Sequence, residues 1–446
     1  MKYCTIHSSI LLIVMIFLFP STAANASFSP QGIKLEAPKW QGTLDKKKRR
    51  VGQWIYGSKS ISLIIANYKA GELHGSYQSF YANGKKRQQA AYITNLLSGQ
   101  FTIYYNNKNN TPAVRGKYHK GHKFRLWSRW TFDHRLISQA NYDKGLLNGH
   151  YVSYVNSKIY QKLHYRHGLL DGLAIKYNPA NKKIVEQGSH LKNVRHGIWR
   201  FWSSDGSKLN KTAQYTKGRL HGIVIQYNEN GRLWKSISYK NGILDGLYKE
   251  YFDIKNKIIS TSGNYTNGKR QGIWTYYYSA SRVWKRSAYI KGNLHGNHIF
   301  YYPSGRVLKT MTYLANKLHG KFEIFSDRKH KSKLLTGQYR NNFRTGKWLY
   351  WYPDGKTANK IVYYKKGSIN GVSTRYYPSG RQWVKSQYKK NELNGVYIEY
   401  YDNARNSKKL RGAHKNNIPN GKWTYWNSQG KVVASHKQKH AKIAFP

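Results

Sequence analysis

A column of basic residues with aromatic neighbours contains the residue types that could bind a ligand in this 446-residue sequence. It recurs every 73 to 75 residues, just after a turn, and two tryptophans follow its arginines by two positions. Its members are Lys85, Lys158, Arg232, Arg306 and Arg381, with Trp234 and Trp383 beside them. Cations next to rings are typical of surfaces that hold polyanions. We therefore predict a polyanion-binding stripe; the alternative is that Lys and Arg after a turn only keep sheet edges soluble.

Catalytic and metal motifs are not found in the sequence. Gly355-Lys356-Thr357 ends like a phosphate-binding loop, but Tyr350 stands where that loop needs its first glycine. Histidines recur before a repeated glycine, yet Asn, Asp and Gln fill the same slot elsewhere, which a metal site would not accept. The sequence predicts no enzyme, with no catalytic residues, metal site, cofactor or small-molecule substrate.

Composition favours a folded but very basic chain. There are 77 Lys and Arg against 18 Asp and Glu, for a formal net charge of +59. High charge usually indicates disorder, but 15% aromatic residues argue against it. Such a charge favours anionic partners and exceeds what solubility requires.

The first 26 residues are typical of a secretory leader. Lys2 precedes an apolar run from Ile10 to Phe19, and Ala24-Asn25-Ala26 forms a small-residue cleavage pattern. We expect cleavage after Ala26, which removes the single cysteine, Cys4, and a secreted or periplasmic protein. Residues 27–51 form a basic linker in this interpretation, with Lys46 to Arg50 as its cationic run.

Residues 52–446 form a series of repeats. Glycines from Gly52 to Gly421 fall into register at intervals of 23 to 26 residues, with Arg125 where one glycine is missing, which gives about sixteen units. Each unit has two segments of strand-forming residues separated by turns such as Pro303-Ser304-Gly305 and Lys291-Gly292. We predict an all-β fold of elongated tandem β-hairpins, either an antiparallel meander or a solenoid.

A second period covers three units. The Gly-x-Trp form recurs every 72 to 75 residues at Trp54, Trp127, Trp199, Trp274, Trp348 and Trp423. A glycine in the second strand follows the same rule at Gly116, Gly188, Gly263, Gly337 and Gly412, and suggests a bulge. Two explanations remain open: duplication of a three-hairpin segment, or a coil in which three hairpins complete one turn.

Segments such as Gly346-Lys347-Trp348 through Tyr352-Pro353-Asp354-Gly355, followed by Tyr364-Lys365-Lys366-Gly367, resemble the MORN repeat variant of bacterial proteins, including those named as YwqK-family antitoxins. The resemblance implies antiparallel hairpins laid side by side as a scaffold, a partner-binding surface or a lipid-associated surface. A secretory leader is not expected in an antitoxin that acts inside the cell.

Three functions are therefore compared. The first is an exported scaffold for an anionic polymer or surface, such as an envelope glycan, an anionic lipid or nucleic acid. The second is a scaffold for a host or envelope protein. The third is a choline-binding-like cell-wall module, which three aromatic hairpins per turn would resemble but which a cationic surface disfavours.

Overall fold

The computed structural model describes residues 39–58, 61–278, 282–328 and 332–438. The leader that the sequence predicts, residues 1–26 with Cys4, lies outside them. The chain divides into two compact units, Met1–Leu96 and Leu97–Pro446. None of the described residues belongs to a helix long and apolar enough to span a bilayer.

The secondary structure of the described residues is all β. The first strands are β1 Lys39–Leu44, β2 Arg50–Ser58, β3 Ile61–Lys69, β4 Glu72–Phe80, β5 Lys86–Ile93 and β6 Leu96–Leu97. They are followed by β7 Gly99–Tyr104, β8 Pro112–His119, β9 His122–Trp130, β10 Leu136–Asp143, β11 Leu146–Val155, β12 Lys158–Arg166, β13 Leu169–Leu170, β14 Gly172–Tyr177, β15 Ile184–Leu191, β16 Val194–Trp202, β17 Leu209–Thr216, β18 Arg219–Tyr227, β19 Leu233–Lys240, β20 Ile243–Tyr251, β21 Ile259–Thr266 and β22 Lys269–Tyr277. The last strands are β23 Val283–Ile290, β24 Asn293–Tyr301, β25 Val307–Leu314, β26 Lys317–Phe325, β27 Lys333–Arg340, β28 Phe343–Trp351, β29 Ala358–Lys365, β30 Ser368–Tyr376, β31 Gln382–Lys389, β32 Glu392–Tyr400, β33 Lys408–Lys415, β34 Ile418–Trp426 and β35 Val432–Gln438.

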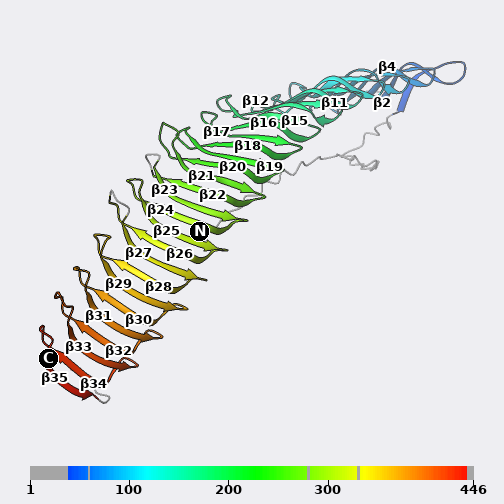
Figure 1. The fold of residues 1–446 in the computed structure, drawn as a ribbon. Helices are drawn as coiled ribbons and strands as arrows, with labels where there is room; N and C mark the ends of the chain where they lie inside the picture. The colour runs from blue at the N-terminus through cyan, green and yellow to red at the C-terminus, as the bar shows by residue number, and fades with distance from the viewer. Residues whose placement is uncertain (1–38, 59–60, 279–281, 329–331, 439–446) are drawn as a thin grey trace. The chain divides into compact units, whose positions relative to one another are not determined.

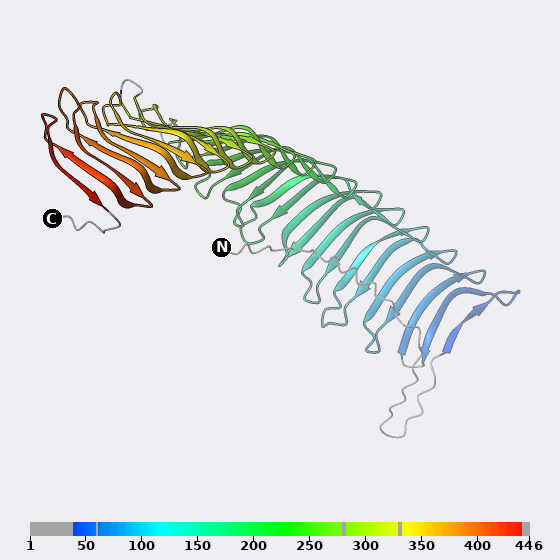
Figure 2. The same cartoon turned by 60° about the horizontal axis from the view of Figure 1, so that its bottom comes forward.

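The strands form one open, antiparallel sheet of 35 strands. In the second unit consecutive strands pair, as β21 does with β22 and β22 with β23, except that the short β13 and the following β14 both pair with β12. Figure 1 and Figure 2 show these strands side by side in chain order, with turns along both edges. The meander that the sequence predicts is confirmed, and the coil is wrong, because the strands pair antiparallel in chain order and the sheet does not close.

Glycine-containing turns connect the strands as the sequence predicts. Between β23 and β24, Lys291 and Gly292 have φ values of 49° and 86°, the positive pair of a two-residue hairpin turn. Between β24 and β25, Gly305 has φ 86°, and its N–H donates to the carbonyl oxygen of Tyr302. These turns fix the register that places side chains on each face.

The repeated anchor glycine is required by the backbone. Gly272 has φ 70° and Gly346 has φ 64°, in a region of backbone conformation that residues other than glycine rarely adopt. Arg125, which replaces this glycine in one unit, adopts φ 59°. The hairpin geometry therefore overrides residue preference at this position.

The three-unit period arises from ring packing on one face. Gly263 lies between the first strands of two hairpins, and Tyr248 and Trp274 meet over it with ring centroids 5.3 Å apart. A Cβ atom at Gly263 would lie 2.6 Å from Cγ of Trp274. The same overlap with a tryptophan ring recurs at Gly116, Gly188, Gly337 and Gly412.

The register does shift at these glycines, as between Ser262 and Asn264. However, it also shifts between Ala140 and Tyr142, and between Ile237 and Tyr239, where no glycine stands. A bulge therefore does not explain the glycine; the indole ring that covers it does.

The sheet begins before the segment that the sequence assigns to repeats. Strand β1 pairs with β2 and supplies Gly42, which lies under the ring of Trp54. Part of the expected linker 27–51 is therefore strand. The basic run from Lys46 to Arg50 forms the turn between β1 and β2 and ends on the first residue of β2. In this turn Arg49 forms an ion pair with Asp45.

Replacing Gly263 with Ala should destabilise β21 and β22, because the added methyl group must displace the indole ring of Trp274. We expect a loss of about 1–3 kcal/mol in the local opening free energy, measured by hydrogen exchange of the amides in these strands. The loss should shrink in a Trp274→Leu background. An equal loss in both backgrounds would contradict ring overlap as the cause.

Replacing Arg125 with Gly should stabilise β9, because a positive φ costs an ordinary side chain about 1–2 kcal/mol and glycine's extra freedom in the unfolded chain offsets only part of this. We expect a gain of roughly 0.5–1 kcal/mol in hydrogen-exchange protection. Arg125→Ala, which keeps the strain, is the matched control and should show no gain.

Candidate anion-binding face

One face of the sheet bears the tryptophan column and most of the partly buried cations. We call it the cationic face and define it by the side on which the rings of Trp199, Trp274 and Trp348 lie. Residues two apart on a strand share a face, and so do residues opposite each other on paired strands. In the second unit its cations are Lys123, Arg129, Lys176, Arg195, Lys211, Lys235, Arg270, Lys285, Lys309, Arg344, Lys360 and Arg375.

A guanidinium lies over each of three tryptophans. The Cζ atoms of Arg195 and Arg270 are each 4.4 Å from the ring centroids of Trp199 and Trp274, and Arg344 lies 4.5 Å from Trp348. The basic residue stands four positions before its tryptophan. The sequence signal Arg-x-Gly-x-Trp, which the prediction missed, marks these three arginines.

Tyrosines hold these rings from the side. Tyr265 and Tyr289 flank Trp274 edge-on, with centroids 5.0 and 6.4 Å from its ring. The indole Nε1 of Trp274 donates a hydrogen bond of 3.1 Å to the carbonyl oxygen of Asn264. The arginine therefore rests on a ring that is fixed on its other sides.

A second row on the same face alternates lysines with aromatic rings. Lys211 Nζ lies 4.3 Å from the ring centroid of Phe201, and Lys309 Nζ lies 4.7 Å from that of Phe300. Lys285 Nζ lies 4.1 Å from the ring of Tyr276. Lys285 on β23 and Lys309 on β25 are two strands apart, which corresponds to about 10 Å, whereas Lys211 lies further away on β17.

Carboxylates are scarce on this face. In the described part of the second unit they are Glu186, Glu250 and Glu399, of which Glu186 pairs with Arg195 and Glu250 with Lys235. From β22 to β30 the described residues of this face include no carboxylate. The cations of that stretch therefore repel one another without a counter-charge.

This environment disfavours the charged forms of the lysines. Burial lowers the pKa of Lys285, and nearby Arg270 lowers it further. Burial also lowers the pKa of Lys360, assisted by Arg375 and Arg344. An anion placed among these groups would favour the charged forms of both lysines.

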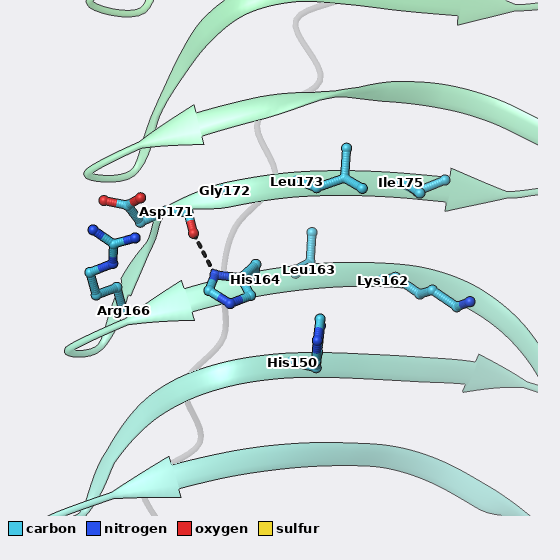
Figure 3. Close-up of a pocket in the computed structure, with 9 residues that line it drawn as sticks. All are labelled: His150, Lys162, Leu163, His164, Arg166, Asp171, Gly172, Leu173 and Ile175. Carbon is cyan, nitrogen blue, oxygen red and sulfur yellow. Dashed lines mark hydrogen bonds between the residues drawn. The ribbon is translucent and has the colours of Figure 1, made fainter.

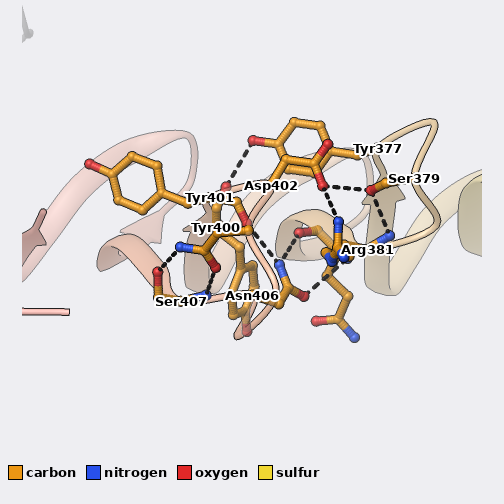
Figure 4. A network of polar contacts seen from close by, with 10 residues as sticks. Tyr377, Ser379, Arg381, Tyr400, Tyr401, Asp402, Asn406 and Ser407 are labelled. Carbon is orange, nitrogen blue, oxygen red and sulfur yellow. Dashed lines mark hydrogen bonds and ion pairs between the residues drawn. The ribbon is translucent and has the colours of Figure 1, made fainter. Parts of the chain in front are cut away.

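The predicted arginine column lies along one edge of the sheet, the edge formed by the turns that follow β18, β24 and β30. Arg232, Arg306 and Arg381 each donate to an aspartate of the next hairpin: Asp253 at 2.9 Å, Asp327 at 3.4 Å and Asp402 at 3.2 Å. Figure 4 shows Arg381 and Ser379 both directed at Asp402. Each of these arginines thus already has an anionic partner within the chain.

Tyrosines strengthen the same edge. The hydroxyl of Tyr377 donates to the carbonyl oxygen of Tyr400, and that of Tyr401 to the carbonyl oxygen of Trp426. Tyr278, Tyr302 and Tyr352 make the equivalent bond. The edge is a set of contacts between consecutive hairpins, in which the three arginines take part.

The other predicted residues are placed differently. Trp234 and Trp383 are 42% and 41% exposed, but the cation over Trp234 is Lys235, at 4.1 Å, and Trp383 stacks on Tyr377. Lys158 donates to the carbonyl oxygen of Ala180. Lys85 lies at the end of the turn after β4, where its carbonyl oxygen accepts from Tyr81. Trp284, 40% exposed and beside Lys285, is an equivalent that the prediction missed.

The opposite face is apolar over part of its length. Ile198, Ile223 and Ile273 are 54–64% exposed there, each directly before its strand's buried column residue. A hollow of about 350 Å³ is lined by residues of β11, β12 and β14, among them His150, His164 and Ile175 (Figure 3). In this hollow Nδ1 of His164 lies 2.7 Å from the carbonyl oxygen of Asp171. Because a carbonyl oxygen can only accept, Nδ1 carries the proton and donates the hydrogen bond. No group of His, Cys, Asp or Glu in the described ranges could hold a metal ion.

Three histidines replace aromatic residues near the tryptophan column. Burial lowers the pKa of His190 and of His414, and it lowers the pKa of His298 to about 4. Their Nδ1 atoms are buried without a hydrogen-bond partner. Protonation at these positions would place charge inside the ring stack.

The fold and this face define an antiparallel β-hairpin repeat protein. The MORN repeat variant model matches residues 73–93, 220–241, 294–315 and 344–366, and the chain therefore carries MORN repeat variant repeats at these four positions. Each match spans one first strand, the turn after it and the next strand, such as β24 and β25. A search of curated proteins found no match.

Three solved structures show a distant likeness to the chain. The Tc holotoxin pore of Photorhabdus luminescens is 9% identical with a TM-score of 0.14, over 88% of this chain and 29% of that one. A TcdB2–TccC3–Cdc42 complex, and TcdB2–TccC3 without its hypervariable C-terminal region, are each 10% identical with TM-scores of 0.13, over 89% and 30%. This chain thus spans under a third of the length of each.

Replacing His298 with Phe should make the free energy of unfolding less dependent on pH. Phenylalanine already occupies the equivalent position of the next hairpin, as Phe322. His298 is 8% exposed and faces Lys285 and Lys309 on the neighbouring strands, so its folded pKa of about 4 lies below its ordinary value of 6.5. The wild-type chain should therefore lose up to about 3 kcal/mol more than the variant between pH 7 and pH 4.

Urea unfolding followed by tryptophan fluorescence at several pH values measures this difference. The contribution of neutral His298 to the free energy of unfolding is fully present above pH 6.5. It is lost as the pH falls toward 4, because the unfolded chain binds a proton that the folded chain does not. His221→Phe, at a half-buried position of β18 directly before the anchor glycine, is the control. Parallel pH profiles for wild type and His298→Phe would contradict the prediction.

Proposed function

We propose that this chain is an exported, non-enzymatic scaffold that binds an anionic polymer or surface through the cationic face. The observation that carries the proposal is the run from β22 to β30, where Arg270, Lys285, Lys309, Arg344 and Lys360 share one face with no carboxylate among the described residues there. A phosphorylated envelope glycan, an anionic lipid surface or nucleic acid would fit such a face.

The arrangement suits many weak contacts rather than one tight pocket. Each lysine or arginine lies on or beside an aromatic ring, so its position is fixed before the ligand arrives. Neighbouring cations on alternate strands can contact successive anionic groups of one polymer, and release of the polymer's counterions then makes affinity fall steeply with salt.

A protein partner is the second candidate. The exposed side chains of Ile198, Ile223 and Ile273 on the opposite face favour it, and so do the exposed rings of Trp234 and Trp383, because exposed apolar groups can contact a protein partner. Binding of that kind should tolerate high salt.

Removing three lysines from the cationic face should weaken polyanion binding more than removing three edge arginines. Lys211→Gln/Lys285→Gln/Lys360→Gln and Arg232→Gln/Arg306→Gln/Arg381→Gln change the net charge equally, but the edge arginines already have aspartate partners. We expect at least tenfold weaker binding of polyphosphate by the lysine variant and about twofold by the arginine variant.

The measurement is a binding titration at several salt concentrations, with uncharged dextran as the neutral polymer. Affinity for polyphosphate should fall with salt, with a smaller slope for the lysine variant. Equal losses in the two variants would point to net charge alone. Absence of binding, or binding that does not depend on salt, would overturn the proposed function and favour the protein partner.

A further inference from the structure

Three clusters on the cationic face share one design. Each has an arginine over a tryptophan, an aromatic residue two positions after that tryptophan, a lysine paired with this aromatic residue on the next strand, and a tyrosine four positions after the lysine. We name them by their arginines. Their members are Arg195, Trp199, Phe201, Lys211 and Tyr215; Arg270, Trp274, Tyr276, Lys285 and Tyr289; and Arg344, Trp348, Tyr350, Lys360 and Tyr364.

The Arg195 cluster holds a carboxylate of its own. Oε1 of Glu186 lies 2.5 Å from Nη2 of Arg195, and Glu186 is the cross-strand partner of Phe201. This carboxylate also opposes the lowering of the pKa of Lys211, which burial and Arg195 cause. One anionic group thus pairs with the arginine of the cluster and favours the charged form of its lysine.

The other two clusters have no such group. Thr261 is the cross-strand partner of Tyr276 and Leu335 that of Tyr350, so these residues occupy the place of Glu186. Neither can supply a charge. Burial and neighbouring arginines lower the pKa values of Lys285 and Lys360, as burial lowers that of Lys211, but here the opposing groups are Tyr289 and Tyr364 rather than a carboxylate.

Tyrosine hydroxyls bind these two guanidinium groups without neutralising them. Nη1 of Arg270 donates to the hydroxyls of Tyr276 at 3.1 Å and Tyr289 at 3.3 Å, and Nη1 of Arg344 donates to that of Tyr364 at 3.1 Å. Burial raises the pKa of Tyr276 to about 12, so its hydroxyl is neutral. A guanidinium has five N–H donors, and its fork suits an oxyanion with two acceptor atoms.

We propose that the Arg270 and Arg344 clusters are two oxyanion sites, each of which takes one phosphate or sulfate group where Glu186 lies in the Arg195 cluster. The inference rests on the proposed function and names the groups that the polymer must present. In each site the arginine and the lysine supply the positive charge, and Tyr276 or Tyr350 supplies a hydroxyl between them.

The spacing of the sites adds a length requirement. The Arg270 cluster begins on β22 and the Arg344 cluster on β28, six strands apart, which corresponds to about 29 Å. A single phosphate ion can occupy one site only. A polymer long enough to bridge both gains from its high effective concentration at the second site.

Filling the sites from within the chain tests the inference. Thr261→Glu/Leu335→Glu should place a carboxylate on each cluster, as Glu186 does on the Arg195 cluster. The matched control is Ser262→Glu/Thr336→Glu, which adds the same charge on the same strands but on the opposite face. We expect the first variant of the full chain to bind polyphosphate at least tenfold more weakly than the control variant.

The reciprocal change should create a third site. Glu186→Thr/Phe201→Tyr gives the Arg195 cluster the composition of the Arg270 cluster, so binding of polyphosphate should become several-fold tighter than in wild type. Far-ultraviolet circular dichroism checks that each variant keeps its sheet. Dextran sulfate, in a parallel titration, shows whether sulfate groups are accepted as well as phosphate.

The outcomes separate this inference from the proposed function. If wild type binds neither polymer, the proposed function fails. If wild type binds but the two acidic variants lose affinity equally, and Glu186→Thr/Phe201→Tyr gains none, the cationic face binds by general charge and the cluster sites are wrong. Selective loss in Thr261→Glu/Leu335→Glu, with either polymer, supports the sites.

Discussion

The packing of a tryptophan ring on a glycine of the neighbouring strand is the interaction on which the rest of this structure depends. The described strands form one sheet with no helix laid over it, so each face must be covered by its own side chains. Trp274 covers the backbone at Gly263, meets Tyr248 across it, and is covered in turn by Arg270. Ring, glycine and cation form one unit of packing, which recurs every three hairpins.

This packing explains why the cations gather on one face. A guanidinium or ammonium group that lies on a ring shields apolar surface from water while it keeps part of its own hydration. Arg270 and Lys285 therefore contribute to the fold and at the same time form a positive surface. The arginines of the edge, such as Arg381, serve a different purpose, because Asp402 of the next hairpin neutralises them. Similar residue types thus stabilise the sheet in one place and leave uncompensated charge in another.

Much of the fold could be predicted from the sequence, because turn residues and strand residues alternate at a fixed interval. Gly292 and Gly305 indicated the two kinds of turn, and both are confirmed. The cause of the three-unit period could not be predicted, since the contact between Gly263 and Trp274 depends on the register of two strands. The placement of Arg232 was missed for the same reason: its partner, Asp253, lies 21 positions further along and becomes a neighbour only when consecutive hairpins are stacked. The Arg270 and Arg344 clusters combine residues from two strands, and only the arginine four positions before each tryptophan was visible in the sequence.

The most direct test of the account is an experimental structure of the chain bound to polyphosphate. The account predicts phosphate groups at the guanidinium of Arg270 and the ammonium of Lys285, and again at Arg344 and Lys360, with the polymer crossing the strands between them. Phosphate groups at the edge arginines beside Asp253, Asp327 and Asp402, or on the face that bears Ile198 and Ile223, would contradict it.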